Sequence, residues 1–251
     1  MINLHLNDLD VFKILCERAS NRSNTARVFS GLLVGMAGDA QELLEYVRNT
    51  HPSFTSHNLQ HSWRALKRIE AVLSPEALAD LSDLEIFSLV TAAAFHDAGM
   101  APPGATRQDH AARSDEFIRS YFDKRLDFLS EYGARLARCI GFIAYSHGMT
   151  WQEMVVSEFF TRRERIAEET LRTGVLCILL RLGDLLDLDS DRSPDVLTQC
   201  MEGYFSEEDA QLHSQRHDHV IHFDLSPAKI AITVESHSKE EHYILSRGAS
   251  N

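Results

Sequence analysis

The residues of this chain that could do chemistry are histidines and aspartates at the ends of apolar helical stretches. His96 and Asp97 stand side by side after the apolar run Ala92–Phe95, just before Gly99 and Pro102. A buried helix normally ends on a solvated or capped residue, so two metal-type ligands in succession indicate that this helix ends in a site. The dipeptide alone is weak evidence, because a hydrogen-bonded helix terminus can use the same two residues.

Histidines of other predicted helices are further candidates. A helix expected to begin at Ser56, capped by Thr55 or Ser56, carries His57 and His61 four residues apart, which places both imidazoles on one face. The alternative for His57 is an exposed side chain without a function. Two imidazoles at helical spacing can project into the same pocket.

Two more predicted helices carry a histidine at one end. A helix over residues 107–122 has His110 in its first turn, and a helix over residues 133–145 leads into His147, which precedes Gly148. His147 therefore occupies the kind of position that His96 occupies.

A late apolar helix, predicted over residues 171–188, contains charged residues. A carboxylate inside such a helix is costly unless it is paired or bound to a metal, so Asp184 requires a partner. Arg181 is predicted to be a structural partner for Asp187 or another carboxylate. Asp187 itself is predicted to cap the helix or to remain in solvent.

The candidate metal ligands combine imidazoles with carboxylates and include no thiolate. Such a set suits hydrolytic chemistry with a divalent ion of manganese, iron, nickel, zinc or magnesium. In chain order the candidates are His61, His96, Asp97, His110, His147 and Asp184.

The order of a histidine, a His-Asp pair and a late aspartate on a helical chain resembles the HD superfamily of metal-dependent phosphohydrolases, over residues 55–195. The resemblance implies four ligands for one ion, which are His61, His96, Asp97 and Asp184. It also implies that Asp97 bridges to a second ion in two-metal members, with His110 and His147 as the extra histidines. Members with a fuller second site often have paired histidines, whereas Ser146 precedes His147 here, so the occupancy of the second site stays open.

Two segments resemble particular subgroups of this superfamily. The start of the predicted helix, His57–His61, is similar to the cyclic-nucleotide phosphodiesterase site, in which the first histidine is the proton donor and the second a metal ligand. The segment 180–188, which continues to Arg192, is most similar to the HD subgroup of multidomain proteins with an Hsp90-like ATPase module. His147 is followed by Gly-Met-Thr rather than by the glycine-tyrosine-proline signature of cyclic-di-GMP phosphodiesterases, which disfavours that substrate.

This resemblance leads to an expected mechanism. Two ions that share Asp97 would hold a bridging hydroxide in line with a phosphorus atom. His57 would protonate the leaving oxygen, and Arg192 or Arg181 would hold a non-bridging phosphate oxygen. Two function classes stay open: a phosphohydrolase that acts on a nucleotide phosphomonoester or phosphodiester, and a non-catalytic metal- or nucleotide-binding sensor that regulates an attached domain.

Composition limits the partners. Among 251 residues, 25 Lys and Arg face 37 Asp and Glu, a net charge of −12 that disfavours extended nucleic acid and anionic membrane surfaces. No apolar stretch approaches the roughly 20 residues needed to span a bilayer, and the four cysteines are widely spaced, as in a reducing compartment. We therefore expect a cytoplasmic protein with a phosphate-containing small molecule, a nucleotide by preference, as its partner. Homo-oligomerisation and membership of a longer protein stay open.

The predicted architecture is mainly α. We expect an N-terminal helical extension over residues 1–50, an HD-type helical bundle over residues 51–215, and a β-hairpin with a tail over residues 216–251. The hairpin is the only convincing β signal, with alternating segments around Ser226–Ala228. The mixed charges of residues 158–172 predict a solvated insertion or helix face.

Overall fold

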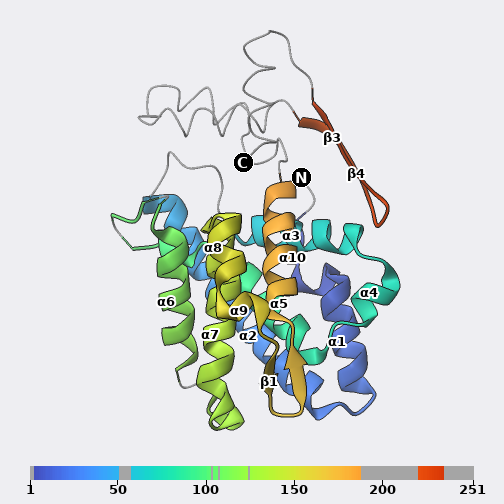
Figure 1. Ribbon diagram of the computed structural model, residues 1–251, viewed down its shortest axis with the longest axis vertical. Helices are drawn as coiled ribbons and strands as arrows, with labels where there is room; N and C mark the ends of the chain where they lie inside the picture. Colours follow the sequence, from blue (N-terminus) through green and yellow to red (C-terminus); the bar gives the residue numbers. More distant parts are fainter. Residues whose placement is uncertain are drawn as a thin grey trace.

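The structure is a computed structural model that describes residues 3–50, 58–102, 104–106, 108–123, 125–187 and 220–234. The mainly α architecture is confirmed, and Figure 1 shows a bundle of helices with two small hairpins. Within the described residues, no helix is both long enough and apolar enough to cross a membrane. Two predicted catalytic residues, His57 and Arg192, lie outside the described residues.

The α-helices are α1 Asp10–Ser20, α2 Asn24–Thr50, α3 Leu59–Val72, α4 Pro75–Ala79, α5 Asp83–Phe95, α6 His110–Phe122, α7 Tyr132–Tyr145, α8 Trp151–Val156, α9 Glu158–Thr161 and α10 Thr173–Leu186. Two short 3-10 helices matter for the site, η2 Ala98–Met100 and η4 Ser146–Gly148. The antiparallel hairpins pair β1 Glu164–Ile166 with β2 Glu169–Leu171, and β3 Val220–Ser226 with β4 Lys229–Val234. The second hairpin is the predicted one.

Helix α5 is the central element, because its side chains from Leu84 to Phe95 are all buried. A helix that is apolar all round must lie inside the bundle, and α5 packs against α2, α3, α7 and α10. Its start is a capping box, in which the Ser82 hydroxyl accepts from the backbone N–H of Glu85, and the Glu85 carboxylate accepts from the backbone N–H of Ser82.

The same Glu85 joins α5 to α10. Its carboxylate is 1% exposed and accepts hydrogen bonds from Arg172 Nε and Nη2, each across 2.7 Å, and from the Arg172 backbone N–H across 3.0 Å. Arg172 is the residue immediately before α10. Both helices thus begin at one partly buried ion pair and run for about 17 Å, at about 1.5 Å per residue, before they reach His96 and Asp184.

The sequence prediction for residues 158–172, a solvated insertion or helix face, is confirmed in part. The segment forms α9 and the hairpin β1–β2, and most of its charged side chains are exposed, Arg162, Arg165 and Glu168 among them. Glu164 is buried beside Ile166, and Glu169 Oε2 accepts a hydrogen bond from the Leu84 backbone N–H across 3.1 Å. Several of these charged residues have partners on other elements. The order of charges along the sequence does not reveal such partners.

Helices α3 and α10 meet at Gly183 without room for a side chain. A Cβ atom built at this glycine would lie 2.6 Å from the carbonyl oxygen of Ala65 and 2.8 Å from Cδ1 of Ile69. The close contact brings together the two helices that carry His61 and Asp184.

We predict that Gly183→Ala destabilises the fold by about 1–3 kcal/mol, because the added methyl group forces backbone to move. Denaturant unfolding followed by circular dichroism measures this change. Gly35→Ala in α2 is the matched control, since nothing lies within 4 Å of a Cβ built there. The control should be neutral or more stable by about 0.5–1 kcal/mol. Equal stability of the two variants would contradict the role of Gly183.

Candidate metal centre

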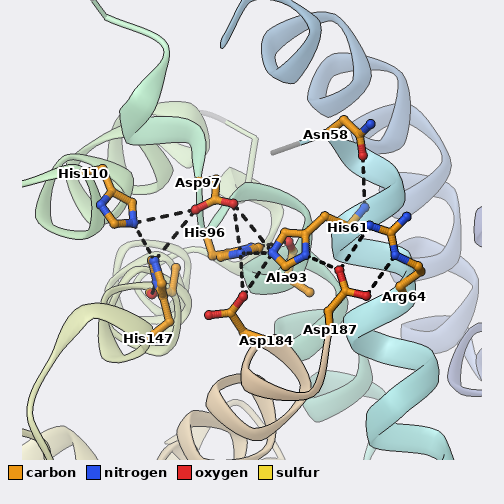
Figure 2. Close-up of polar contacts among 11 residues, drawn as sticks. Asn58, His61, Arg64, Ala93, His96, Asp97, His110, His147, Asp184 and Asp187 are labelled. Carbon is orange, nitrogen blue, oxygen red and sulfur yellow. Dashed lines mark hydrogen bonds and ion pairs between the residues drawn. The ribbon is translucent and has the colours of Figure 1, made fainter. Parts of the chain in front are cut away.

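The predicted histidines and aspartates that the structure describes come together at one end of the bundle (Figure 2). They come from the first turn of α3, the end of α5, the start of α6, the turn after α7 and the last turn of α10. Each therefore lies at or near a helix terminus, including Asp184, which the sequence placed inside its helix, and their polar atoms form two adjoining groups. The six residues are His61, His96, Asp97, His110, His147 and Asp184.

The first group consists of His61, His96 and Asp97, whose ligand atoms could hold one metal ion. The two Nε2 atoms are 3.2 Å apart, and Asp97 Oδ2 lies 3.8 Å from His61 Nε2 and 3.2 Å from His96 Nε2. Two ligands at about 2.0–2.2 Å from one ion stand roughly 3.0–3.6 Å apart at tetrahedral or octahedral angles. The donors and their spacing fit a divalent cation.

Asp184 adds a fourth donor to this group. Its Oδ1 lies 3.0 Å from His61 Nε2 and 3.9 Å from His96 Nε2. Figure 2 shows Asp97 and Asp184 on opposite sides of the two imidazoles. The Asp184 side chain is 24% exposed, whereas the histidine side chains are 1% exposed, so the group opens toward solvent beside Asp184.

The second group consists of Asp97, His110 and His147 and could also hold a metal ion. Asp97 Oδ1 lies 3.7 Å from His110 Nε2 and 3.8 Å from His147 Nε2, and the two Nε2 atoms are 2.8 Å apart. Asp97 therefore directs Oδ2 to the first group and Oδ1 to the second. A carboxylate in this position can bridge two ions.

Backbone carbonyls orient two of the imidazoles. His96 Nδ1 donates to the carbonyl oxygen of Ala93 across 2.8 Å, and His147 Nδ1 donates to that of Ala144 across 2.6 Å. A carbonyl oxygen only accepts, so Nδ1 carries the hydrogen and Nε2 presents its lone pair to the site. Both histidines follow a helix, whose last carbonyls lack helical partners and are free to accept.

The start of α3 differs from the prediction. The sequence placed the N-cap at Thr55 or Ser56, whereas Asn58 is the N-cap and its side-chain oxygen accepts from the His61 backbone N–H across 3.1 Å. His57 therefore precedes the N-cap in the sequence, and helical spacing no longer predicts a shared face for His57 and His61.

The sequence predicted that Asp187 caps its helix or remains in solvent. Asp187 is the C-cap residue of α10, but it is fully buried rather than solvated, and its Oδ2 lies 2.6 Å from His61 Nδ1. Arg64 donates to both of its oxygens. The cost of burying a carboxylate, which the sequence argument applied to Asp184, applies equally to this residue three positions later.

The prediction for Arg181 was also wrong. This guanidinium does not pair with Asp187; it donates instead to the backbone carbonyls of Ser146, across 3.3 Å, and Met149. These carbonyls flank His147, so Arg181 ties the turn η4 to α10.

The charged groups of the centre shift one another's pKa values. Burial opposes a charged imidazole at His96, but the Asp97 and Asp184 carboxylates outweigh it and raise its pKa to about 9. Burial and the neighbouring His96 lower the pKa of His147 to about 4. Although burial opposes ionisation, the hydrogen bond with His61 holds the pKa of Asp184 well below its usual range. Without a metal the first group therefore holds protons, which a bound cation would replace.

The chain is similar to a known protein family. The model of a family described as HD-CE matches residues 51–247, which is more than half of the chain and includes every residue of both groups. No curated protein and no solved structure matches the chain.

The position of Asp97 between the groups generates a prediction about metal content. Asp97→Ala should abolish metal retention in both groups, while His147→Ala should release only the ion of the second group, because among the carboxylate oxygens of the described residues that imidazole contacts Asp97 Oδ1 alone. Elemental analysis after gel filtration measures the metal content. Full metal content in Asp97→Ala and in His96→Ala would show that the pair is a structural helix terminus.

Proposed function

This chain belongs to the HD-CE family, and on that premise we propose that it is a metal-dependent phosphohydrolase that cleaves a phosphomonoester or phosphodiester bond in a nucleotide. The observation that supports the proposal best is the position of Asp97, whose two oxygens face two separate imidazole groups. Purely structural ion pairs do not require one carboxylate to stand between four histidines.

Each group has a role in this proposal. His61, His96, Asp97 and Asp184 would hold the first ion, and Asp97, His110 and His147 would hold the second. Ions bound there would lower the pKa of a bound water and neutralise charge on the phosphate. His110 and His147 have 12% and 6% exposed side chains, against 1% for His61. A substrate would therefore approach over Asp184 and the second group.

Two further roles come from the resemblance and concern residues outside the described part of the chain. His57 precedes the N-cap of α3 and would donate a proton to the leaving oxygen. Arg192 follows α10 and would hold a non-bridging oxygen of the phosphate. Both residues are close in sequence to a ligand-bearing helix end, His57 to His61 and Arg192 to Asp184, and this supports their assignment.

The partner is proposed from the charge of the chain. A net charge of −12 repels a polyanion along its length but does not prevent one phosphate group from reaching a cation. We propose a nucleotide as substrate and a cytoplasmic location. The HD domain is proposed to span residues 51–215, in the subgroup associated with Hsp90-like ATPase modules.

One observation favours the alternative of a non-catalytic sensor. The Nε2 atoms of His110 and His147 lie 2.8 Å apart, within hydrogen-bond distance of one another, and Ser146 stands where a further histidine is often found. A site that binds one ion firmly and the second weakly would suit ligand sensing.

A nucleotide panel tests the proposal. Metal-depleted protein should be inactive, and addition of manganese, nickel or magnesium should restore release of phosphate or of a nucleoside monophosphate. Asp97→Ala should remain inactive with every metal. Saturable nucleotide binding without metal-dependent turnover in the native sequence would favour the sensor.

The assignment of His57 as the proton donor to the leaving oxygen gives a separate prediction. His57→Ala should keep its metal and lose about 10²–10⁴-fold in turnover, because the leaving oxygen loses its proton donor. The loss should shrink for p-nitrophenyl esters, since p-nitrophenolate departs without protonation. A full rate on every leaving group, with metal retained, would exclude His57 and make His147 the next candidate.

A further inference from the structure

We propose that Asp187 is a positioning residue of the metal centre, which fixes His61 in the tautomer and orientation that present Nε2 to an ion, and that Arg64 holds this carboxylate in place. The inference rests on the proposed metal-dependent function and deepens it. It concerns an arrangement of α3 and α10 that lies behind the ligands, away from the second group.

The contacts that carry the inference are buried. His61 Nδ1 donates to Asp187 Oδ2 across 2.6 Å, and the two side chains are 1% and 0% exposed. Arg64 donates from Nε to Asp187 Oδ1 across 2.9 Å and from Nη2 to Oδ2 across 3.2 Å. Figure 2 shows the carboxylate between the imidazole and the guanidinium, on the side of His61 opposite to His96.

The position of His61 explains why it needs a carboxylate. His96 and His147 follow helices and use the carbonyl of the residue three positions earlier. His61 lies in the first turn of α3, where the nearby backbone offers N–H groups, and the carbonyl of Asn58 already accepts from the His61 backbone N–H across 2.9 Å. An acceptor for Nδ1 must therefore come from another element, and α10 supplies it.

Arg64 lies one turn after His61, so one face of α3 presents both residues to Asp187. A fully buried carboxylate is stable only with a charged or hydrogen-bonded partner, and the two Arg64 contacts meet that need. The carboxylate is a stronger acceptor than the carbonyls that hold the other imidazoles, so it makes Nε2 of His61 a better donor to a metal. The backbone N–H of Asp187 donates to the carbonyl oxygen of Asp184 at the end of α10, while the Asp187 side chain contacts α3.

The test uses the full chain with zinc as the probe. Asp187→Asn is nearly isosteric, and we expect it to weaken the tightest zinc site by about 10–100-fold, as loss of an outer partner of a metal-bound histidine does. Arg64→Gln should weaken the site in the same direction but less. Competition with a chelator measures the affinity, and circular dichroism confirms that each variant is folded.

The matched control is Asp115→Asn, since Asp115 accepts from Arg119 across 2.8 and 2.6 Å, away from both groups. This control should bind zinc like the native sequence. Nitrogen-15 chemical shifts of the His61 ring distinguish a positioning role of Asp187 from a general role in stabilising the fold. Nδ1 should be protonated and Nε2 metal-bound in the native sequence, whereas Asp187→Asn should populate a ring with protonated Nε2.

The inference is overturned if Asp187→Asn and Arg64→Gln, both folded, keep native zinc affinity and native ring shifts. In that case the proposed function stands, because the native sequence still binds its metal. If the native sequence binds no zinc, nickel or manganese, the proposed function fails and the inference fails with it. If Asp187→Asn does not fold, Arg64→Gln alone decides: an unchanged affinity rejects the inference.

Discussion

The structure depends on the burial of two carboxylates, Asp97 and Asp187, inside an apolar bundle. They are 3% and 0% exposed, and an ion buried without partners costs several kcal/mol even after the protein relaxes. Imidazoles surround Asp97, and His61 and Arg64 flank Asp187. The helices that carry these groups must all end at the same place, so the position of the charges fixes the arrangement of α3, α5 and α10 in the bundle.

Helix polarity then decides how three of the imidazoles are held. His96 and His147, which follow helices, use the free carbonyls at the helix ends, whereas His61, in the first turn of α3, uses the Asp187 carboxylate at the end of α10. At the other end of the bundle, Glu85 and Arg172 bring the starts of α5 and α10 together. A partly buried ion pair at one end and the candidate metal centre at the other are thus connected by two helices of nearly equal length.

Much of this arrangement could be predicted from the sequence. Apolar periodicity predicted the helices, and ligand types on these helices or at their ends predicted the six residues that the structure brings together. The partners of Asp187 and Arg181 were missed because they lie on other elements, and the hairpin β1–β2 was missed because its strands are three residues long and rich in charge. The N-cap of α3 was misplaced because Thr55, Ser56 and Asn58 are all good caps, and only the fold selects one.

The two halves of the centre are built differently, and this difference bears on the chemistry. The first half has four donors, and its histidines are locked by a backbone carbonyl at His96 and by a carboxylate at His61. The second half has three donors, is more exposed, and holds His110 and His147 in contact with each other. In the first half the closest donor pairs, at 3.0 to 3.2 Å, already have the spacing of ligands on one ion, whereas the Nε2 atoms of the second half are 2.8 Å apart and would have to separate around an ion. The first half is therefore better suited than the second to hold a divalent ion.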